Sequence, residues 1–132
     1  MQLLLIRHGQ PEFAAVPDGV ADPELTELGR TQAGRLPDAV SRFGVRSVYS
    51  SPQIRAVQTA EPVADAIGGT IHGLEGLAEF DYGHALYVPL EDAAAAAPTY
   101  YARLQSGQLP EEVNLAAFRG RIDAAIATIV AQ

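Results

Sequence analysis

The sequence predicts an α/β fold, a mostly parallel sheet flanked by helices. Short apolar runs of strand length alternate with stretches in which apolar residues recur every three or four positions, and the chain closes on an amphipathic helix. Such alternation favours a parallel sheet, because parallel strands need a crossover connection that is usually helical. The length of 132 residues and the hydrophobic content of 48% suit one domain with a buried core, which we place at residues 1–132.

The first predicted strand is Leu3–Ile6, an unbroken apolar run too short for a helix. We expect it to be buried on both faces, as strands of parallel sheets are. Arg7 and His8 follow directly, and ligands of open α/β sheets gather where strands end at their carboxyl side. A guanidinium beside an imidazole of near-neutral pKa indicates a phosphate or carboxylate substrate.

The first predicted helix begins after a loop rich in proline, glycine and aspartate. Thr26 is an acceptable N-cap, and Glu27 falls in the positive first turn. Its expected apolar stripe comprises Leu25, Leu28 and Leu36. Glycines and a proline within this stretch predict a helix that is short or kinked.

A second strand is predicted at residues 47–50 and a third at residues 70–74. The helix between them is expected to start at Ser51-Pro52, with a capping hydroxyl and a proline at the first helical position. Its apolar residues recur at helical spacing up to the Gly68-Gly69 stop.

Residues 82–114 show no clear periodicity and are interpreted as an insert over the active site. The clearest helix follows, with Asn114 as cap and one continuous apolar face running toward the end of the chain. Such a face requires a surface against which to dock.

The candidate site gathers at one edge of the predicted sheet. Arg55 lies in the first turn of the helix that follows the second strand, where backbone N–H groups and the helix dipole favour an anion. Arg7, Arg55 and this helix N-terminus would hold a phosphoryl group against His8, whose neutral imidazole is a competent nucleophile.

Glu79 follows the third strand and is expected at the same edge. Desolvation and the like charge of a phosphate dianion should raise the pKa of its carboxyl group, so that it could protonate a leaving alkoxide. Asp81 is the second candidate for this role. His72 and His84 are interpreted as structural or surface residues. Each candidate alone fits an ordinary structural role, and it is their convergence that favours a catalytic site.

The composition excludes several classes of function. The formal charge is −7, and no basic stripe offers a surface to nucleic acid. The sequence contains no cysteine, no metal-ligand spacing and no glycine-rich nucleotide loop, so neither a metal nor a cofactor is predicted. No stretch is apolar and long enough to cross a membrane or to form a signal peptide, and we expect a cytoplasmic location.

Four segments resemble the histidine phosphatase superfamily, also called the phosphoglycerate mutase-like family. Each is weak alone, but they occur in the family's order: residues 4–10, 25–33, 50–60 and 77–83. The resemblance implies that His8 becomes phosphohistidine, that Arg7 and Arg55 bind phosphate, and that Glu79 is the general acid. It implies no metal and no organic cofactor. Gly9 and Gln10, next in the first motif, are further candidates for substrate binding.

One element of the family's pattern is absent from this sequence. The family carries a second histidine in a Ser-His-Gly or Thr-His-Gly turn after a later strand, and that strand lies between the first two strands of the sheet. Neither His72 nor His84 has that context. An empty slot would expose apolar faces of the sheet and of the last helix. The chain is then incomplete at its C-terminus, or repacked, or covered by a partner, and we expect incompleteness.

The predicted activity is that of a phosphatase acting on a small phosphomonoester. Mutases of phosphoglycerate need extra cations for the substrate carboxylate, whereas the segment after Glu79 offers only Arg103 among four acidic residues, namely Glu91, Asp92, Glu111 and Glu112. The alternatives are mutase-type phosphoryl transfer and a non-catalytic phosphate-binding module. The expected partner is a small phosphorylated substrate or free phosphate, and a homo-oligomer is left open.

Overall fold

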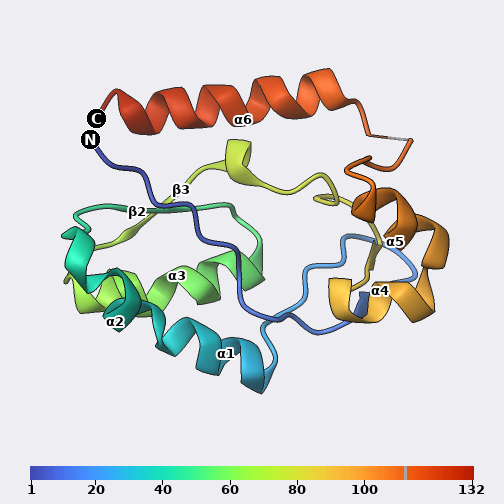
Figure 1. Ribbon diagram of the computed structural model, residues 1–132, viewed down its shortest axis with the longest axis horizontal. Coiled ribbons are helices and arrows are strands. Elements are labelled where there is room, and N and C mark those ends of the chain that lie inside the picture. The colour runs from blue at the N-terminus through green and yellow to red at the C-terminus, as the bar shows by residue number, and fades with distance from the viewer. Residues whose placement is uncertain (112) are drawn as a thin grey trace.

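The computed structural model describes residues 1–111 and 113–132, arranged mainly in three layers (Figure 1). A long C-terminal helix forms one outer layer, a pair of parallel strands lies in the middle, and three helices form the other outer layer. These elements are α6 (Leu115–Val130), β2 (Val48–Ser50), β3 (Ile71–Gly73), α1 (Glu27–Gly34), α2 (Leu36–Val40) and α3 (Ile54–Ala66).

The parallel pair β2–β3 confirms two of the predicted strands. Val48 pairs with Ile71 and Ser50 with Gly73, and α3 connects the two strands. The predicted glycine stop also holds, since Gly68 adopts a φ of 63° just after α3 ends. Both strands therefore end at the same edge, where their following loops meet.

The predicted N-terminal strand is wrong. Leu3–Ile6 forms no strand, and Leu5 is 82% exposed instead of buried on both faces. No backbone hydrogen bond joins this run to any other described segment. An apolar run becomes a strand only when a neighbouring strand satisfies its N–H and C=O groups, and here none lies alongside.

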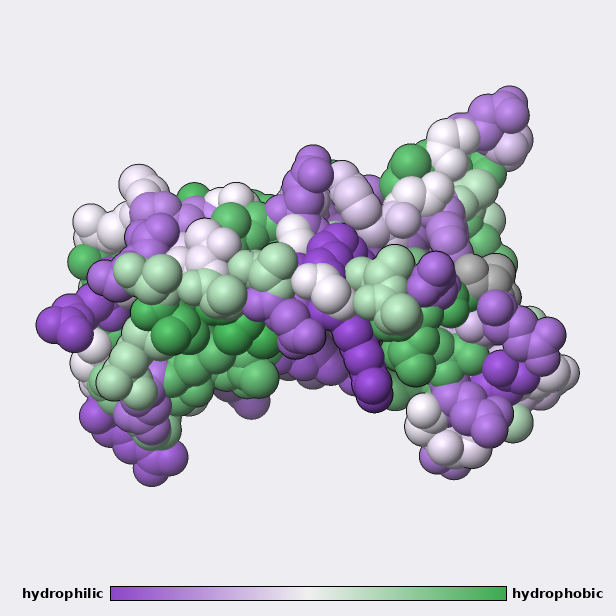
Figure 2. Space-filling model, turned by 90° about the horizontal axis from the view of Figure 1, so that it is seen from above, coloured by the Kyte–Doolittle hydropathy of each residue, from purple (hydrophilic) through white to green (hydrophobic). Residues whose placement is uncertain are grey.

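The predicted C-terminal helix is confirmed, including its cap. The Asn114 side chain accepts a hydrogen bond from the backbone N–H of Ala117 at 3.0 Å. Its apolar face is only partly covered: Ala125 and Ile129 are buried, whereas Leu115 and Val130 are exposed. The sequence analysis predicted that the slot of the absent strand would leave apolar faces of the sheet and of this helix exposed. Figure 2, a view from above, shows broad hydrophobic areas on this face of the molecule.

Helix α1 begins where predicted, because the Thr26 hydroxyl accepts a hydrogen bond from the Gly29 N–H at 2.9 Å. The expected apolar stripe is partly wrong: Leu28 is exposed, and Gly29 and Ala33 are the buried residues. A Cβ at Gly29 would lie 2.1 Å from the carbonyl oxygen of Gln10. The helix therefore packs its small residues against the backbone that follows His8.

The segment after Glu79 contains structure that the sequence did not predict. β4 (Leu86–Tyr87) pairs antiparallel with β1 (Ala14–Ala15), which belongs to the loop before α1. Two short helices, α4 (Leu90–Ala96) and α5 (Pro98–Gln105), follow at one end of the molecule (Figure 1). Two-residue strands are too short for a periodic pattern to reveal them.

Candidate active site

Arg55 is the most deeply buried charged side chain of the site, with 1% of it exposed. It occupies the first turn of α3, as predicted. Its Nη2 donates to both carboxylate oxygens of Asp81, at 3.1 and 3.0 Å. Its guanidinium carbon lies 4.1 Å from the ring centre of Tyr87, which covers its face.

Two donor atoms of this guanidinium have no hydrogen-bond partner in the described structure. They are Nε and Nη1, both fully buried; Oδ1 of Asp22 lies 4.0 Å from Nη1, too far for a hydrogen bond. Buried donors left without a partner cost free energy, about 1–3 kcal/mol each, and native proteins avoid them unless a ligand or water completes the site. A group with two acceptor oxygens would satisfy both atoms.

His8 lies beside Arg55 through a shared neighbour. One carboxylate oxygen of Glu79, Oε2, is 3.8 Å from Nε2 of His8 and 3.6 Å from Nη2 of Arg55. Nδ1 of His8 lies 2.8 Å from the carbonyl oxygen of Gly9. Since only a protonated Nδ1 can donate there, the lone pair of a neutral imidazole is on Nε2, which faces the site.

Gly9 and Gln10 anchor the segment that carries His8. The Gly9 N–H donates to the Thr59 hydroxyl at 3.0 Å, and a Cβ at Gly9 would lie 2.6 Å from the carbonyl oxygen of Gly29. The Gln10 carbonyl accepts from the backbone N–H of Thr26 at 2.9 Å. These contacts give both residues a structural role in the free protein, and their contact with substrate stays a prediction.

The pKa of Glu79 moves in the direction opposite to the one predicted. The interaction with the His8 side chain lowers this pKa most, and the positive charges of Arg55, Arg7 and, when its imidazole is protonated, His8 lower it further. Desolvation raises it, as expected, but is outweighed. The prediction considered the phosphate dianion and neglected the cations that receive it, so the free carboxyl group is ionised at neutral pH.

Asp81 and Tyr87 have raised pKa values, and burial is the main cause for both. Desolvation raises the pKa of the Asp81 carboxyl group, although Arg55 opposes this and Glu79 adds to it. The pKa of Tyr87 rises to about 12, so its hydroxyl stays neutral. The sequence missed the part that Asp81 plays here, because nothing in its local pattern indicated pairing with Arg55.

Arg7 differs from Arg55 in its exposure and in its lack of a paired carboxylate among the described residues. It is exposed, and neither a hydrogen bond nor an ion pair joins it to another residue within 1–111 and 113–132. It lines a pocket together with Glu79 and Asp81. Its guanidinium is therefore available to a ligand.

The N-terminus of α3 departs from the prediction. The helix begins at Ile54 rather than at Ser51-Pro52, with Gln53 as cap residue and no side-chain cap. The Ile54 N–H donates to a carboxylate oxygen of Asp22 at 2.9 Å. A carboxylate from a distant loop thus occupies the place where the sequence predicted phosphate at the helix end.

Gln53 instead positions the loop that carries Glu79 and Asp81. Its Oε1 accepts from the Glu79 N–H at 3.0 Å, and its Nε2 donates to Asp81 at 3.2 Å. Arg121 of α6 holds the same loop from the other side, since its Nη1 donates to the carbonyl oxygens of Glu75, Gly76 and Ala78 at 3.0, 3.1 and 2.7 Å.

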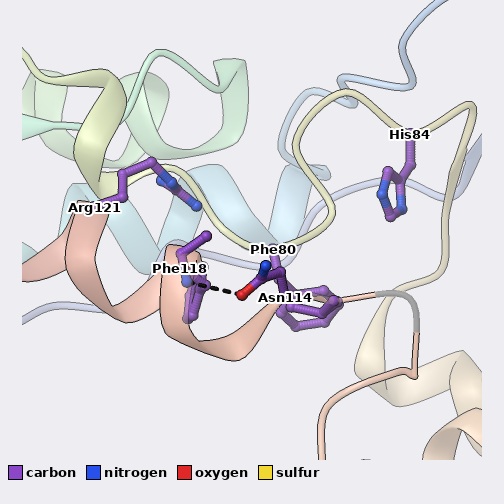
Figure 3. Close-up of a pocket in the computed structure, with 7 residues that line it drawn as sticks. Phe80, His84, Asn114, Phe118 and Arg121 are labelled. Carbon is purple, nitrogen blue, oxygen red and sulfur yellow. Dashed lines mark hydrogen bonds between the residues drawn. The ribbon is translucent and has the colours of Figure 1, made fainter.

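A second pocket, away from His8, lies beside α6 (Figure 3). Phe80, His84, Phe118 and Arg121 are among its lining residues. His84 is exposed there, and His72 is exposed on β3, where its ring centre lies 5.0 Å from that of Tyr49. Neither histidine reaches the candidate site.

Neither a metal site nor a membrane-spanning helix occurs among the residues that the structure describes. No group of three histidine, aspartate or glutamate side chains there is placed to hold a metal ion. No helix among the same residues is both long and apolar enough to cross a membrane.

Comparisons with known proteins identify the family of this chain. The family model of the histidine phosphatase superfamily (branch 1) matches residues 3–132. The chain therefore belongs to the histidine phosphatase superfamily.

Individual relatives include both phosphatases and mutases. Phosphoserine phosphatase 1 of Hydrogenobacter thermophilus is 34% identical over 85 residues, 63% of this chain and 40% of that protein. A 2,3-bisphosphoglycerate-dependent phosphoglycerate mutase of Rhizobium meliloti is 36% identical over 101 residues, 70% of this chain and 47% of that protein. A solved mycobacterial glucosyl-3-phosphoglycerate phosphatase superposes with a TM-score of 0.68 at 27% identity, covering 95% of this chain and 65% of that one.

The chain thus spans between about two fifths and two thirds of the length of these relatives.

Proposed function

We propose that this protein hydrolyses a small phosphomonoester through a phosphohistidine intermediate on His8. The observation that carries the proposal is the pair of buried, unpartnered donors on Arg55, a side chain that shares the Glu79 carboxylate with Nε2 of His8. Two equatorial phosphoryl oxygens fit those donors, and Arg7 supplies a second cation. Membership of the superfamily supports this assignment.

The first step forms a bond between Nε2 of His8 and phosphorus and breaks the ester P–O bond. The alkoxide that leaves takes a proton from Glu79, whose Oε2 lies 3.8 Å from Nε2. In the second step water attacks phosphorus, its proton passes to Glu79, and the P–N bond breaks. Inorganic phosphate leaves and His8 is restored.

Glu79 can act as an acid only if substrate raises its pKa. In the free protein the neighbouring cations lower that pKa. A phosphate dianion neutralises those cations and adds a like charge, and both effects raise the pKa. Substrate binding therefore supports protonation of the group that must donate.

Phosphate binding without chemistry is the second candidate function. The lowered pKa of Glu79 favours it, because an ionised carboxylate cannot protonate a leaving group. In that case Arg7 and Arg55 serve as an anion clamp. Mutase-type transfer has less support, since Arg103 is engaged with Leu109 and Glu111. Of the acidic residues around it, Glu112 and the side chain of Glu91 lie outside the described residues.

Trapping of a labelled phosphoenzyme tests the proposal. The whole chain, incubated with ³²P-labelled p-nitrophenyl phosphate, should take up label that acid removes and alkali does not, and should release phosphate in the presence of EDTA. The variant His8→Ala should lose both signals, and the matched control His84→Ala should keep them. Turnover that persists in His8→Ala would refute the phosphohistidine step.

The other outcomes identify the alternatives. Phosphate binding without label or release would identify a binding module. Conversion of 3-phosphoglycerate to its isomer would identify a mutase. The cytoplasmic location and the homo-oligomer stay predictions, and sedimentation of the purified chain would measure its oligomeric state.

A further inference from the structure

A pocket of about 300 Å³ opens beside the proposed acid, Glu79, and the proposed reaction uses no lining residue beyond Arg7 and Glu79. Arg7, Glu79 and Asp81 lie at the end that faces the phosphate site. The ester oxygen of a phosphomonoester bound at Arg55 would point toward Glu79, because that group protonates it. The alcohol part of the substrate would then extend into this pocket.

The wall of the pocket is mainly apolar and aromatic, with Gln105 as an additional polar lining residue. It is built mostly by the segment after Glu79, which includes β4, α4 and α5. The residues concerned are Phe80, Tyr87, Val88, Leu90, Tyr100 and Leu104. Tyr87 keeps a neutral hydroxyl and has its ring against Arg55, so this wall presents hydrocarbon and ring surface.

Beyond the cation assigned to phosphate, the described lining of the pocket offers none for a second anionic group on the substrate. Arg7 is the only arginine that lines it among the described residues, and the proposed reaction already assigns Arg7 to phosphate. Arg103, the cation of α5, donates from Nε and Nη2 to the carbonyl oxygen of Leu109 and from Nη1 to Glu111. A carboxylate on the substrate would lie near Glu79 and Asp81, and the described lining holds no further cation to offset its charge.

From this geometry we infer that the substrates are phosphomonoesters of uncharged, largely apolar alcohols, with an alkyl or aryl group seated against the wall formed by Val88, Leu90 and Leu104. This inference rests on the proposed function and narrows its substrate class. It sets the chain apart from relatives whose names specify carboxylated compounds, such as phosphoserine and phosphoglycerate.

Binding of phosphonates tests the inference without requiring chemistry. Two probes match in shape and differ in charge: 3-methylbutylphosphonate and 2-carboxyethylphosphonate. Calorimetry with the whole chain should give a dissociation constant at least about tenfold lower for the alkyl probe. Lengthening an n-alkylphosphonate from methyl to pentyl should tighten binding about threefold to fourfold per methylene.

Substitutions in the pocket wall test whether the alkyl group of the phosphonate binds there. Leu104→Ala should reduce the preference for the alkyl probe about fivefold or more, and Val88→Ala should act in the same direction if Leu104→Ala does not fold. The matched control Leu28→Ala, at an exposed position of α1, should leave the preference unchanged. A preference that survives both pocket substitutions would place the alkyl group elsewhere and overturn the inference.

The remaining outcomes separate this inference from the proposed function. If both phosphonates bind with equal affinity, and Arg55→Met abolishes binding of both, the phosphate site stands and the apolar pocket does not select substrate. Tighter binding of the carboxylated probe would likewise overturn the inference alone. If neither probe nor inorganic phosphate binds, the proposed function and the inference both fail.

Discussion

The two arginines that the sequence predicted to bind phosphate lie in very different regions. Arg55 is buried in α3, paired with Asp81 and covered by Tyr87. Arg7 is exposed on a segment that forms no strand, and no ion pair holds it within the described chain. A fixed, desolvated guanidinium can set the position of an anion, whereas a solvated one mainly adds charge. We therefore expect Arg55 to determine where phosphate binds and Arg7 to adjust how strongly.

Substitution of Arg55 should have the largest effect. Arg55→Met leaves the carboxylates of Asp81 and Glu79 without their buried partner, so the free energy of unfolding should fall by about 3 kcal/mol. Phosphate affinity should fall at least a hundredfold. Denaturant unfolding and calorimetry measure the two quantities, with Arg119→Met on the exposed side of α6 as the control. A phosphate affinity within twofold of the original would contradict the assignment of Arg55.

Gly9 links the segment of Arg7 to α3, because its N–H donates to the Thr59 hydroxyl. Its substitution should have the second largest effect. A Cβ there would lie 2.6 Å from the Gly29 carbonyl oxygen, so Gly9→Ala must displace the backbone that carries His8. We expect a loss of about 1–3 kcal/mol in the free energy of unfolding, together with loss of His8-dependent turnover. Gly34→Ala is the matched control, since nothing lies within 4 Å of its added Cβ; it should be neutral or stabilising by up to about 1 kcal/mol. Equal effects of the two substitutions would argue against the close approach.

Substitution of Arg7 should separate charge from stability. Arg7→Gln should change the free energy of unfolding by less than about 0.5 kcal/mol, while the phosphate dissociation constant rises about threefold to tenfold at low salt. This difference should shrink as salt is added, because exposed charges are screened. Calorimetry at two ionic strengths measures it. A large loss of stability would show that Arg7 is held more firmly than its exposure indicates.

The titration of Glu79 should show the smallest effect. Its pKa in the free protein should lie below the usual 4.5, because His8 and the arginines stabilise the carboxylate. A lowered pKa stabilises the folded state above pH 4.5 and loses that contribution as the pH falls through the folded value. Carbon-13 NMR of the Glu79 carboxyl group should give a midpoint below 4.5, which moves upward when phosphate binds. If phosphate leaves the midpoint unchanged, Glu79 does not face the bound phosphoryl group.

Local patterns predicted the elements whose evidence is itself local. The caps of α1 and α6 at Thr26 and Asn114 lie where expected, as does the parallel pair β2–β3. A cap depends on residues three positions apart, and a strand flanked by a helix and a turn leaves its own period in the sequence. The order of the motifs likewise identified the superfamily.

Contacts between distant residues decided the rest. The sequence predicted strands both at residues 47–50 and at Leu3–Ile6, but β2 has a neighbouring strand, whereas no backbone hydrogen bond joins Leu3–Ile6 to another described segment. The start of α3 moved because Asp22, 32 residues earlier, binds the Ile54 N–H. The pKa of Glu79 falls because cations from two separate segments surround it.

By itself the sequence determined which chemistry is available: a histidine, two arginines and a glutamate in family order, with helices and strands set by periodicity and caps. Only the tertiary structure decided how each group is held. It paired Arg55 with Asp81, left two of its donors unpartnered, and set an apolar wall beside Glu79. The reason is physical, since burial and partnership depend on neighbours in space, and these lie 26 residues apart for Arg55 and Asp81.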